Sequence, residues 1–468
     1  MKILTYPFLI FFLLIFFSCS VKEEKNSFLL KDYVMRNDDS FRYEVVDTIV
    51  GDNWKEFKIK MVSGRWMSVN EIDSNEWWHW VSMVIPDDVQ QTESMMIIGA
   101  GSADDQEISP TNELIVQAAI DTKSIISEVT NIPFQPIDFK DDGKDGRYED
   151  DLIAYGWRKF LEGGAQDMDS EWLARFPMTR AVVKAMDVVQ EINKDIHPID
   201  SFFVTGASKR GWTTWTTAVV DDRVIGIAPI VIDLLNVVPS FTHHWRVYGE
   251  WSLAIEDYID EGIMEWMGSK EYNKLLDIVE PYSYRKTLKL PKFIINATND
   301  EFFVTDSWKF YWNNLAGEKH IQYIPNTDHG LNGTYKLESL VSFYNSIISD
   351  TDIPKYDWKI SNDTIYLNID PKLTYEIHKW EVINQDNRDF RKPVVGESWE
   401  SFEIEKNEDG NYVINILKPD NGYKAALIEI IINPNSDFPF TFTSGTLVLP
   451  DVYPFPPFVS DNPKGTRK

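Results

Sequence analysis

Short apolar runs alternate with amphipathic segments from residue 94 onward, and this alternation constrains the fold more than any other feature of the chain. Segments with helical spacing occur at 111–119, 149–162 and 177–194. Such an alternation predicts a largely parallel sheet buried between two layers of helices, so the expected fold class is α/β. The apolar runs of strand length lie at 94–98, 124–129, 201–205, 224–232, 291–297 and 320–324.

Three further strand patterns precede this alternation, at 43–50, 54–66 and 77–85. We therefore expect the α/β domain to span residues 41–352. An aromatic stretch with helical spacing interrupts the alternation at about 239–290. Because it lies between two predicted strands, it predicts a helical cap inserted over the strand ends.

The character of the sequence changes beyond residue 354, where alternating strands are separated by turns such as Asp409-Gly410. A Gly after Asp between alternating strands is a strong hairpin signal. We expect a C-terminal antiparallel, sandwich-like β domain at 355–458. The polar residues 459–468 predict a disordered tail.

The N-terminus carries an apolar run from Tyr6 to Phe17, which is typical of an export signal and too short for an ordinary membrane span. Cys19 follows this run and resembles the residue at which bacterial lipoproteins are cleaved and lipidated. We expect a signal peptide at 1–18, a lipid on Cys19 and a polar tether at 19–40. The predicted location is outside the cytoplasm, anchored to a bacterial membrane by the lipid alone; a soluble secreted protein is the alternative.

A short acidic stretch, Lys22-Glu23-Glu24, comes soon after that cysteine. It is similar to the signals that send some bacterial lipoproteins to the outer cell surface. Two orientations of the anchor stay open, toward the periplasm or toward the outside of the cell, and this stretch favours the outside.

Charge and cysteine content exclude several classes of function. The 468 residues include 46 basic and 74 acidic side chains, for a net charge of -28, which would repel nucleic acid. Cys19 is the only cysteine, so neither a disulfide nor a cysteine nucleophile is expected. The sequence has no H-E-x-x-H motif and no Cys/His cluster, so we expect no catalytic metal and no cofactor.

Ser208 lies in the segment 206–211, Gly-Ala-Ser-Lys-Arg-Gly, between the strand 201–205 and a helix-like run at 212–220. A nucleophile elbow needs this context, because small residues around the serine permit a strained turn that exposes its hydroxyl above the sheet. The usual pattern is G-x-S-x-G, whereas here Arg210 occupies the second glycine position and Gly211 comes one residue later. The segment predicts Ser208 as a nucleophile.

An acid and a histidine follow Ser208 in the order that a serine hydrolase on this kind of sheet requires. Asp300 lies in the polar turn that follows the strand 291–297, and His329 comes shortly after the strand 320–324. We expect His329 to act as general base and Asp300 to orient it. Three other acids remain alternatives for Asp300, and the other six histidines are interpreted as packed or solvated. The alternative acids are Asp306, Asp328 and Glu301.

The oxyanion of such a reaction needs two backbone amide donors, one after the nucleophile and one after the third strand of the fold. The amide of Lys209 meets the first condition. The loop 99–102, Gly-Ala-Gly-Ser, follows an early strand and offers Ala100 and Gly101 for the second.

The chain resembles the PhoPQ-activated pathogenicity-related proteins of PqaA type, over roughly residues 40–450. The resemblance rests on 206–211, on 298–301 (Thr-Asn-Asp-Glu), on 325–330 (Pro-Asn-Thr-Asp-His-Gly) and on 149–155. It implies an exported protein of α/β-hydrolase fold with an appended β domain. The basic residues beside Ser208 also resemble those of glucuronoyl esterases, in which a basic side chain assists the oxyanion.

These patterns lead to a hypothesis of a serine hydrolase that cleaves an ester or peptide bond through an acyl-enzyme. A carbohydrate esterase similar to glucuronoyl esterases is the specific alternative, with a cell-surface or extracellular polymer among the candidate substrates. A non-catalytic surface-binding lipoprotein on a hydrolase scaffold is the alternative from a different class.

Overall fold

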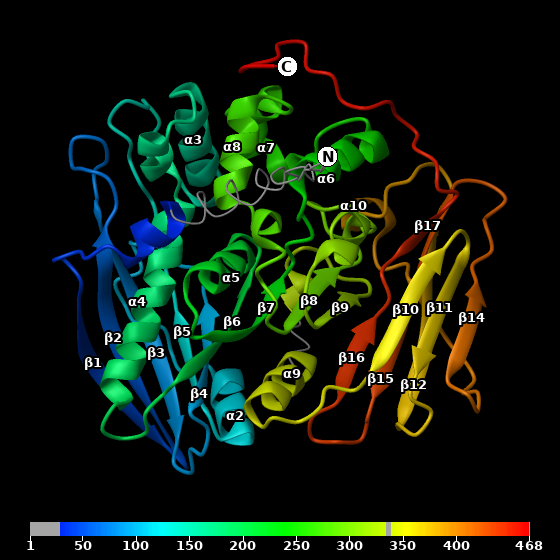
Figure 1. The fold of residues 1–468 in the computed structure, drawn as a ribbon, viewed down its shortest axis with the longest axis horizontal. Coiled ribbons are helices and arrows are strands. Elements are labelled where there is room, and N and C mark those ends of the chain that lie inside the picture. The colour runs from blue at the N-terminus through cyan, green and yellow to red at the C-terminus, as the bar shows by residue number, and fades with distance from the viewer. Residues whose placement is uncertain (1–28, 334–337, 468) are drawn as a thin grey trace, which may run out of the picture.

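The computed structural model describes residues 29–333 and 338–467. The expected signal peptide and Cys19 lie outside the described residues. Figure 1 shows two parts, a large mixed α/β body and a smaller all-β domain beside it. Within the described ranges, none of the helices is both long and apolar enough to cross a membrane.

The α/β body is built on a nine-stranded sheet whose first strands are antiparallel and whose remaining strands are parallel. Residues in the parallel part are buried on both faces, which is why these strands appear in the sequence as nearly continuous apolar runs. The strands, in their order across the sheet, are β1 (Arg42–Gly51), β2 (Trp54–Arg65), β3 (Glu76–Pro86), β5 (Ile125–Val129), β4 (Glu93–Ile98), β6 (Ser201–Ala207), β7 (Val224–Ile230), β8 (Lys292–Ala297) and β9 (Lys319–Ile324).

Helices cover both faces of this sheet. On one face, α2 (Glu113–Thr122) and α9 (Glu338–Ile348) share an apolar core with the strands. On the other face, α3 (Glu149–Glu162), α4 (Arg175–Asn193) and α5 (Lys209–Val220) share a second core with them. With a parallel sheet between two helical layers, the predicted α/β fold class is confirmed.

The cap expected at about 239–290 consists of short helices between β7 and β8. These contact α3 and cover the strand ends on that side (Figure 1). Its elements are α6 (Val237–Tyr248), η2 (Leu253–Ile255), α7 (Glu256–Asp260), η3 (Ile263–Trp266), α8 (Lys270–Val279) and η4 (Pro281–Tyr284). Four other short 3-10 turns are η1 (Asp167–Trp172), η5 (Ser307–Phe310), η6 (Trp312–Asn314) and η7 (Leu331–Gly333).

The C-terminal domain consists of two antiparallel sheets, as predicted. Tyr375 of one sheet and Tyr412 of the other lie with their hydroxyls 3.0 Å apart in the space between the sheets. The strands are β10 (Tyr356–Ser361), β11 (Thr364–Ile369) and β14 (Asn411–Asn415) in the first sheet, and β13 (Glu400–Glu403), β12 (Tyr375–Asn384), β15 (Tyr423–Ile432), β16 (Phe440–Thr443) and β17 (Leu447–Leu449) in the second; helix α10 (Lys392–Val395) lies between β12 and β13.

The two domains share a packed interface. Thr443 of β16 accepts a hydrogen bond from the backbone amide of Tyr323 in β9, at 3.0 Å. The rings of Phe293 and Phe442 meet edge to face with their centroids 5.5 Å apart. The hydrophobic core of the sheet therefore continues into the second domain.

Two boundaries differ from expectation. Residues 29–35, assigned to the tether, form a helix in which Leu30 and Val34 are completely buried, because these apolar side chains pack into the core of the α/β body. The C-terminal residues, expected to be disordered, fold back over the cap (Figure 1). There Arg467 donates to the carbonyl oxygen of Met267 at 2.6 Å, and Thr466 donates to Glu271.

Candidate active site

Ser208 lies at a strained turn between β6 and α5. Its backbone has φ 56° and ψ −124°, a conformation that a non-glycine residue adopts only when the surroundings impose it. Two glycines make the turn possible. A Cβ at Gly206 would lie 2.9 Å from the carbonyl oxygen of Arg210, and one at Gly211 would lie 2.9 Å from that of Ile230. The second glycine is thus needed one residue later than usual, where α5 approaches β7.

Ser208, His329 and Asp300 form one hydrogen-bonded chain. Ser208 Oγ lies 2.9 Å from His329 Nε2, and His329 Nδ1 lies 2.8 Å from Asp300 Oδ2. The carboxylate is in turn fixed by the backbone amides of Phe302 and Phe303, which donate to its other oxygen. With Nδ1–H donated to Asp300, the Nε2 lone pair is left to accept the serine proton.

The alternative acids have other partners. Glu301 accepts a hydrogen bond from the backbone amide of His329, at 3.0 Å, and so holds the histidine loop. Asp328 accepts from the amide of Asn332 within its own turn. Asp306 pairs with a different histidine, His243, at 2.7 Å.

The loop expected to supply oxyanion donors follows β4, as predicted. Ala100 lines the same cavity as Ser208 and Lys209. The carbonyl oxygen of Gly101 accepts a hydrogen bond from the Gln135 side chain at 2.9 Å. Among the described residues, none accepts a hydrogen bond from the backbone amides of Ala100 and Gly101. These two amides are therefore free to bind an anionic oxygen.

The basic side chains beside Ser208 are paired with carboxylates. Lys209 Nζ lies 2.7 Å from Glu149 and 2.8 Å from Asp150, and the Arg210 guanidinium grips Glu149 with both of its terminal nitrogens. Burial opposes ionisation of Glu149, but its hydrogen bonds and ion pairs with Arg210 and Lys209 outweigh this and lower its pKa to about 2. The resemblance to glucuronoyl esterases suggested a free positive charge near the oxyanion, and here these charges are already neutralised.

Glu149 and Gln135 are site residues that the sequence reasoning missed. Gln135 donates to Glu149 at 2.7 Å as well as to the carbonyl of Gly101, so the carboxylate connects the start of α5 with the loop after β4. The acidic triplet that opens helix α3 was the signal available for Glu149. No sequence pattern around Gln135 indicates a role in the site.

The C-terminal domain supports the loops that carry the acid and the histidine. Asn299, next to Asp300, donates to the carbonyl of Phe390 at 2.8 Å and accepts through its own carbonyl from the amide of Lys392. Asn326, three residues before His329, exchanges two hydrogen bonds with the backbone of Trp399. The second domain therefore contacts the residues flanking both loops.

A strand–turn–helix serine, an acid after β8 and a histidine after β9, on a mostly parallel sheet, define the class of proteins with the α/β-hydrolase fold. Within that class, residues 30–391 match the family model described as PhoPQ-activated pathogenicity-related protein. The chain belongs to this family, and the predicted resemblance is confirmed.

One similar protein is the "Autocrine proliferation repressor protein A" of Dictyostelium discoideum, 35% identical over 456 residues, which cover 91% of each chain. Among solved structures, an acetyl xylan esterase from Paenibacillus sp. R4 is 12% identical, with a TM-score of 0.48 over 71% of this chain and 96% of that one. A glucuronoyl esterase from Solibacter usitatus is 11% identical, with a TM-score of 0.41 over 69% and 91%.

Proposed function

We propose that this protein is an exported serine hydrolase in which Ser208 is the nucleophile, His329 the general base and Asp300 the acid that orients it. The observation that carries the proposal is the chain of two hydrogen bonds from Ser208 through His329 to Asp300. It opens onto a cavity of about 490 Å³, so a substrate has room to reach the serine.

The reaction begins when Ser208 Oγ attacks the carbonyl carbon and passes its proton to His329 Nε2. The backbone amides of Lys209 and Ala100, with Gly101 as the neighbouring donor, hold the negative oxygen that develops. His329 then gives the proton to the leaving oxygen or nitrogen, the bond to it breaks, and an acyl-enzyme remains. Water, deprotonated by His329, attacks this ester, releases the acid and restores Ser208.

An ester bond and a peptide bond both fit this mechanism, because the carbonyl group of either makes the same demands on Ser208, His329 and Asp300. We favour an ester, because its leaving group needs less help from the general acid. A carbohydrate ester is one form such a substrate can take.

Fluorophosphonate labelling tests the nucleophile directly. We expect the protein that begins at residue 21 to be labelled, and Ser208→Ala and His329→Ala to lose the label. His378→Ala is the matched control, because this partly exposed histidine lies in the second domain. Labelling of Ser208→Ala, or a folded wild-type protein that resists the probe, would refute the proposal.

We further propose that Cys19 is lipidated and anchors the protein to the outside of a bacterial membrane. The support is the position of the only cysteine, which follows the apolar leader with Ser18 between them. Metabolic labelling with an alkyne fatty acid should mark the full-length protein and not Cys19→Ala. Label in the variant, or none in the wild type, would contradict the anchor.

A non-catalytic role outside the cell is the second candidate, and the name of the Dictyostelium relative favours it, since an autocrine repressor acts as an extracellular signal. Under this hypothesis the Ser208→Ala protein would keep the full biological effect of the wild type on cell proliferation. Loss of the effect in that variant would assign it to hydrolysis instead.

A further inference from the structure

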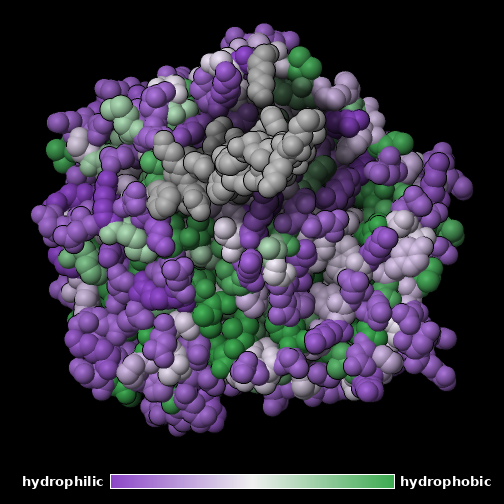
Figure 2. Space-filling model, in the orientation of Figure 1, coloured by the Kyte–Doolittle hydropathy of each residue, from purple (hydrophilic) through white to green (hydrophobic). Residues whose placement is uncertain are grey.

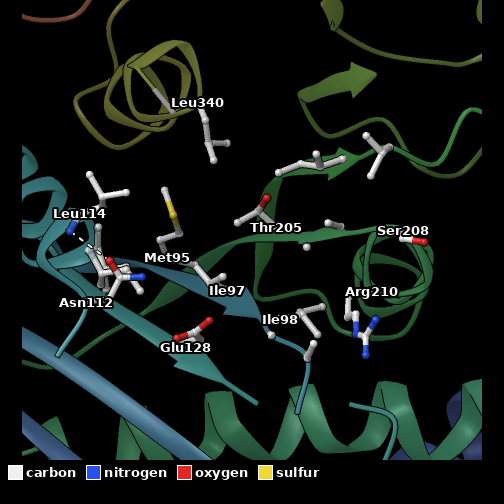
Figure 3. Close-up of a pocket in the computed structure, with 18 of the residues that line it drawn as sticks. Met95, Ile97, Ile98, Asn112, Leu114, Glu128, Thr205, Ser208, Arg210 and Leu340 are labelled. Carbon is white, nitrogen blue, oxygen red and sulfur yellow. Dashed lines mark hydrogen bonds between the residues drawn. The ribbon is translucent and has the colours of Figure 1, made fainter. Parts of the chain in front are cut away.

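A hydrophobic cavity extends from Ser208 along one face of the sheet, between α2 and α9. Figure 3 shows Ser208 at one end, Leu114 and Asn112 of the α2 region at the other, and Leu340 of α9 above the strands. Leu114 is 60% exposed, so the far end of the cavity reaches the surface. Figure 2 shows apolar side chains at the surface in this region, over α2 and α9.

The walls of this cavity are mainly aliphatic. β4 contributes Met95 and Ile97, α2 contributes Ile115 and Ala118, and α9 contributes Leu340. Two of the polar groups among them are engaged within the protein. Thr205 donates to the carbonyl of Ala228 at 2.7 Å, and Asn112 accepts from the amide of Leu114. An occupant would therefore exchange water for hydrocarbon over most of its length.

Glu128 is the one carboxyl group among the described residues that line the cavity. Burial raises its pKa, with the charge of Lys58 acting in the opposite direction. Whenever the Glu128 carboxyl group is ionised, it repels an anionic occupant of the cavity. The basic residues Lys209 and Arg210 give an anion no compensation, because Glu149 already pairs with both.

The two sides of Ser208 differ greatly in the room they offer. A second hollow touches Ser208 on the side of the cap, beside Trp212 and Phe241, and its volume is only about 30 Å³. The cavity toward α2 and α9 has about 490 Å³, and its wall includes the strand that leads into the nucleophile. The acyl group stays bonded to Ser208 after the leaving group departs, so a pocket built on this strand suits the acyl part of the substrate.

We propose that this cavity binds an uncharged aliphatic acyl chain, so that the enzyme cleaves medium-chain acyl esters in preference to acetyl esters and to esters of sugar acids. The proposal rests on the serine hydrolase function proposed above and names its substrate class. The chain lies along Met95, Ile97 and Ala118, with its end toward the opening at Leu114.

The first test is hydrolysis of p-nitrophenyl esters with acyl chains of two to twelve carbons. We expect kcat/KM to rise by up to about fourfold per methylene, the factor that burial of one CH2 provides, until the chain fills the cavity. An ester of glutaric acid, which ends in a carboxylate, should be cleaved more slowly than the valerate ester of equal chain length. A rate that falls steadily from acetate overturns the proposal.

A blocking variant tests the location. Ala118→Phe should remove the preference for long chains, lowering kcat/KM for octanoate at least tenfold and for acetate less than about threefold. Gln117→Phe places the same ring on the exposed side of the same helix and should behave like the wild type. An unchanged octanoate rate in a folded Ala118→Phe protein would contradict the assignment.

Two further measurements separate this inference from the proposed function. Phosphonates with a methyl or a hexyl group on phosphorus should label Ser208 at different rates, the hexyl compound faster. A protein that reacts with both at equal rates is a serine hydrolase without the acyl pocket, whereas one that reacts with neither overturns both proposals. A preference that follows the alcohol of acetate esters, and not the acyl group, would assign the cavity to the leaving group instead.

Discussion

Two histidine–aspartate pairs take their acids, Asp300 and Asp306, from the segment that follows β8, and the two pairs differ in burial and in their other partners. His329 and Asp300 are joined at 2.8 Å, and the histidine keeps 16% of its side-chain surface exposed. His243 and Asp306 are joined at 2.7 Å, and the side chain of this histidine is completely buried.

The remaining partners separate the two pairs. The free nitrogen of His329 meets the serine hydroxyl at the cavity, whereas that of His243 meets the hydroxyl of Tyr453 at 3.0 Å. Asp306 also binds Arg388 at 2.6 Å and Lys309 at 2.7 Å. Burial opposes its ionisation, but these cations hold its pKa well below the usual range. An acid–histidine pair therefore suits proton transfer only where the second ring nitrogen of the histidine reaches a reactive group beside open space.

The largest expected contrast is in rate. Asp300→Asn should lower kcat by about 10⁴, because the histidine loses the partner that fixes its tautomer. Asp306→Asn should leave kcat within about tenfold of the wild type. Ester turnover by the two purified variants measures this difference in kcat. Equal losses of kcat in both variants would contradict the distinction between the two pairs.

The effect on stability should be the reverse, with Asp306→Asn more destabilising than Asp300→Asn. Asp306→Asn leaves the buried Arg388 without its carboxylate, and loss of one partner of a buried pair costs about 3–5 kcal/mol of unfolding free energy. Asp300→Asn should cost less, because within the described part of the chain no lysine or arginine pairs with Asp300. Urea unfolding measures both, and the double variant Asp306→Asn, Arg388→Met should recover part of the loss.

The pH dependence of stability sharpens the comparison further. Burial lowers the pKa of His243 from 6.5 to about 4. Between these values the unfolded chain binds a proton that the folded protein does not, so this histidine makes stability fall as pH drops from 6.5 toward 4. His243→Gln should flatten that part of the curve, as measured by urea unfolding at pH 7.5 and 4.5. Identical slopes in both proteins would contradict the buried, neutral ring.

The smallest expected effect is that of substituting Glu149, which belongs to neither histidine–aspartate pair. Glu149→Gln should lower kcat about tenfold, because Lys209 and the loop at Gly101 lose their common anchor and the oxyanion donors shift. The change should appear in kcat more than in KM. Glu162→Gln, an exposed carboxylate on the same helix, is the control and should leave both constants unchanged.

Much of this arrangement could be predicted from the sequence because its signals are local. Parallel strands that are buried on both faces must be apolar throughout, and the elbow at Ser208 needs small residues at fixed distances. The order of Ser208, Asp300 and His329 follows from the order of the strands. Each of these features can be seen within a dozen residues.

The features that were missed depend on contacts between distant segments. Leu30 and Val34 lie in a polar stretch, and only the core that receives them reveals their role. The hydrogen bond from Gln135 reaches the first residue of helix α3, and the tail at Arg467 finds its partners about 200 residues earlier. No local pattern encodes a partner at such a distance, since the fold alone brings it near.

The hydrogen bonds from Asn299 and Asn326 to the segment around residues 390–399 have a consequence for how the chain can be divided. A protein cut at residue 354 would keep all three members of the trio and lose the backbone groups that these two asparagines bind. The family match itself runs on to residue 391, past the boundary between the domains. Truncation, fusion and domain exchange should therefore treat residues 29–467 as one unit of expression.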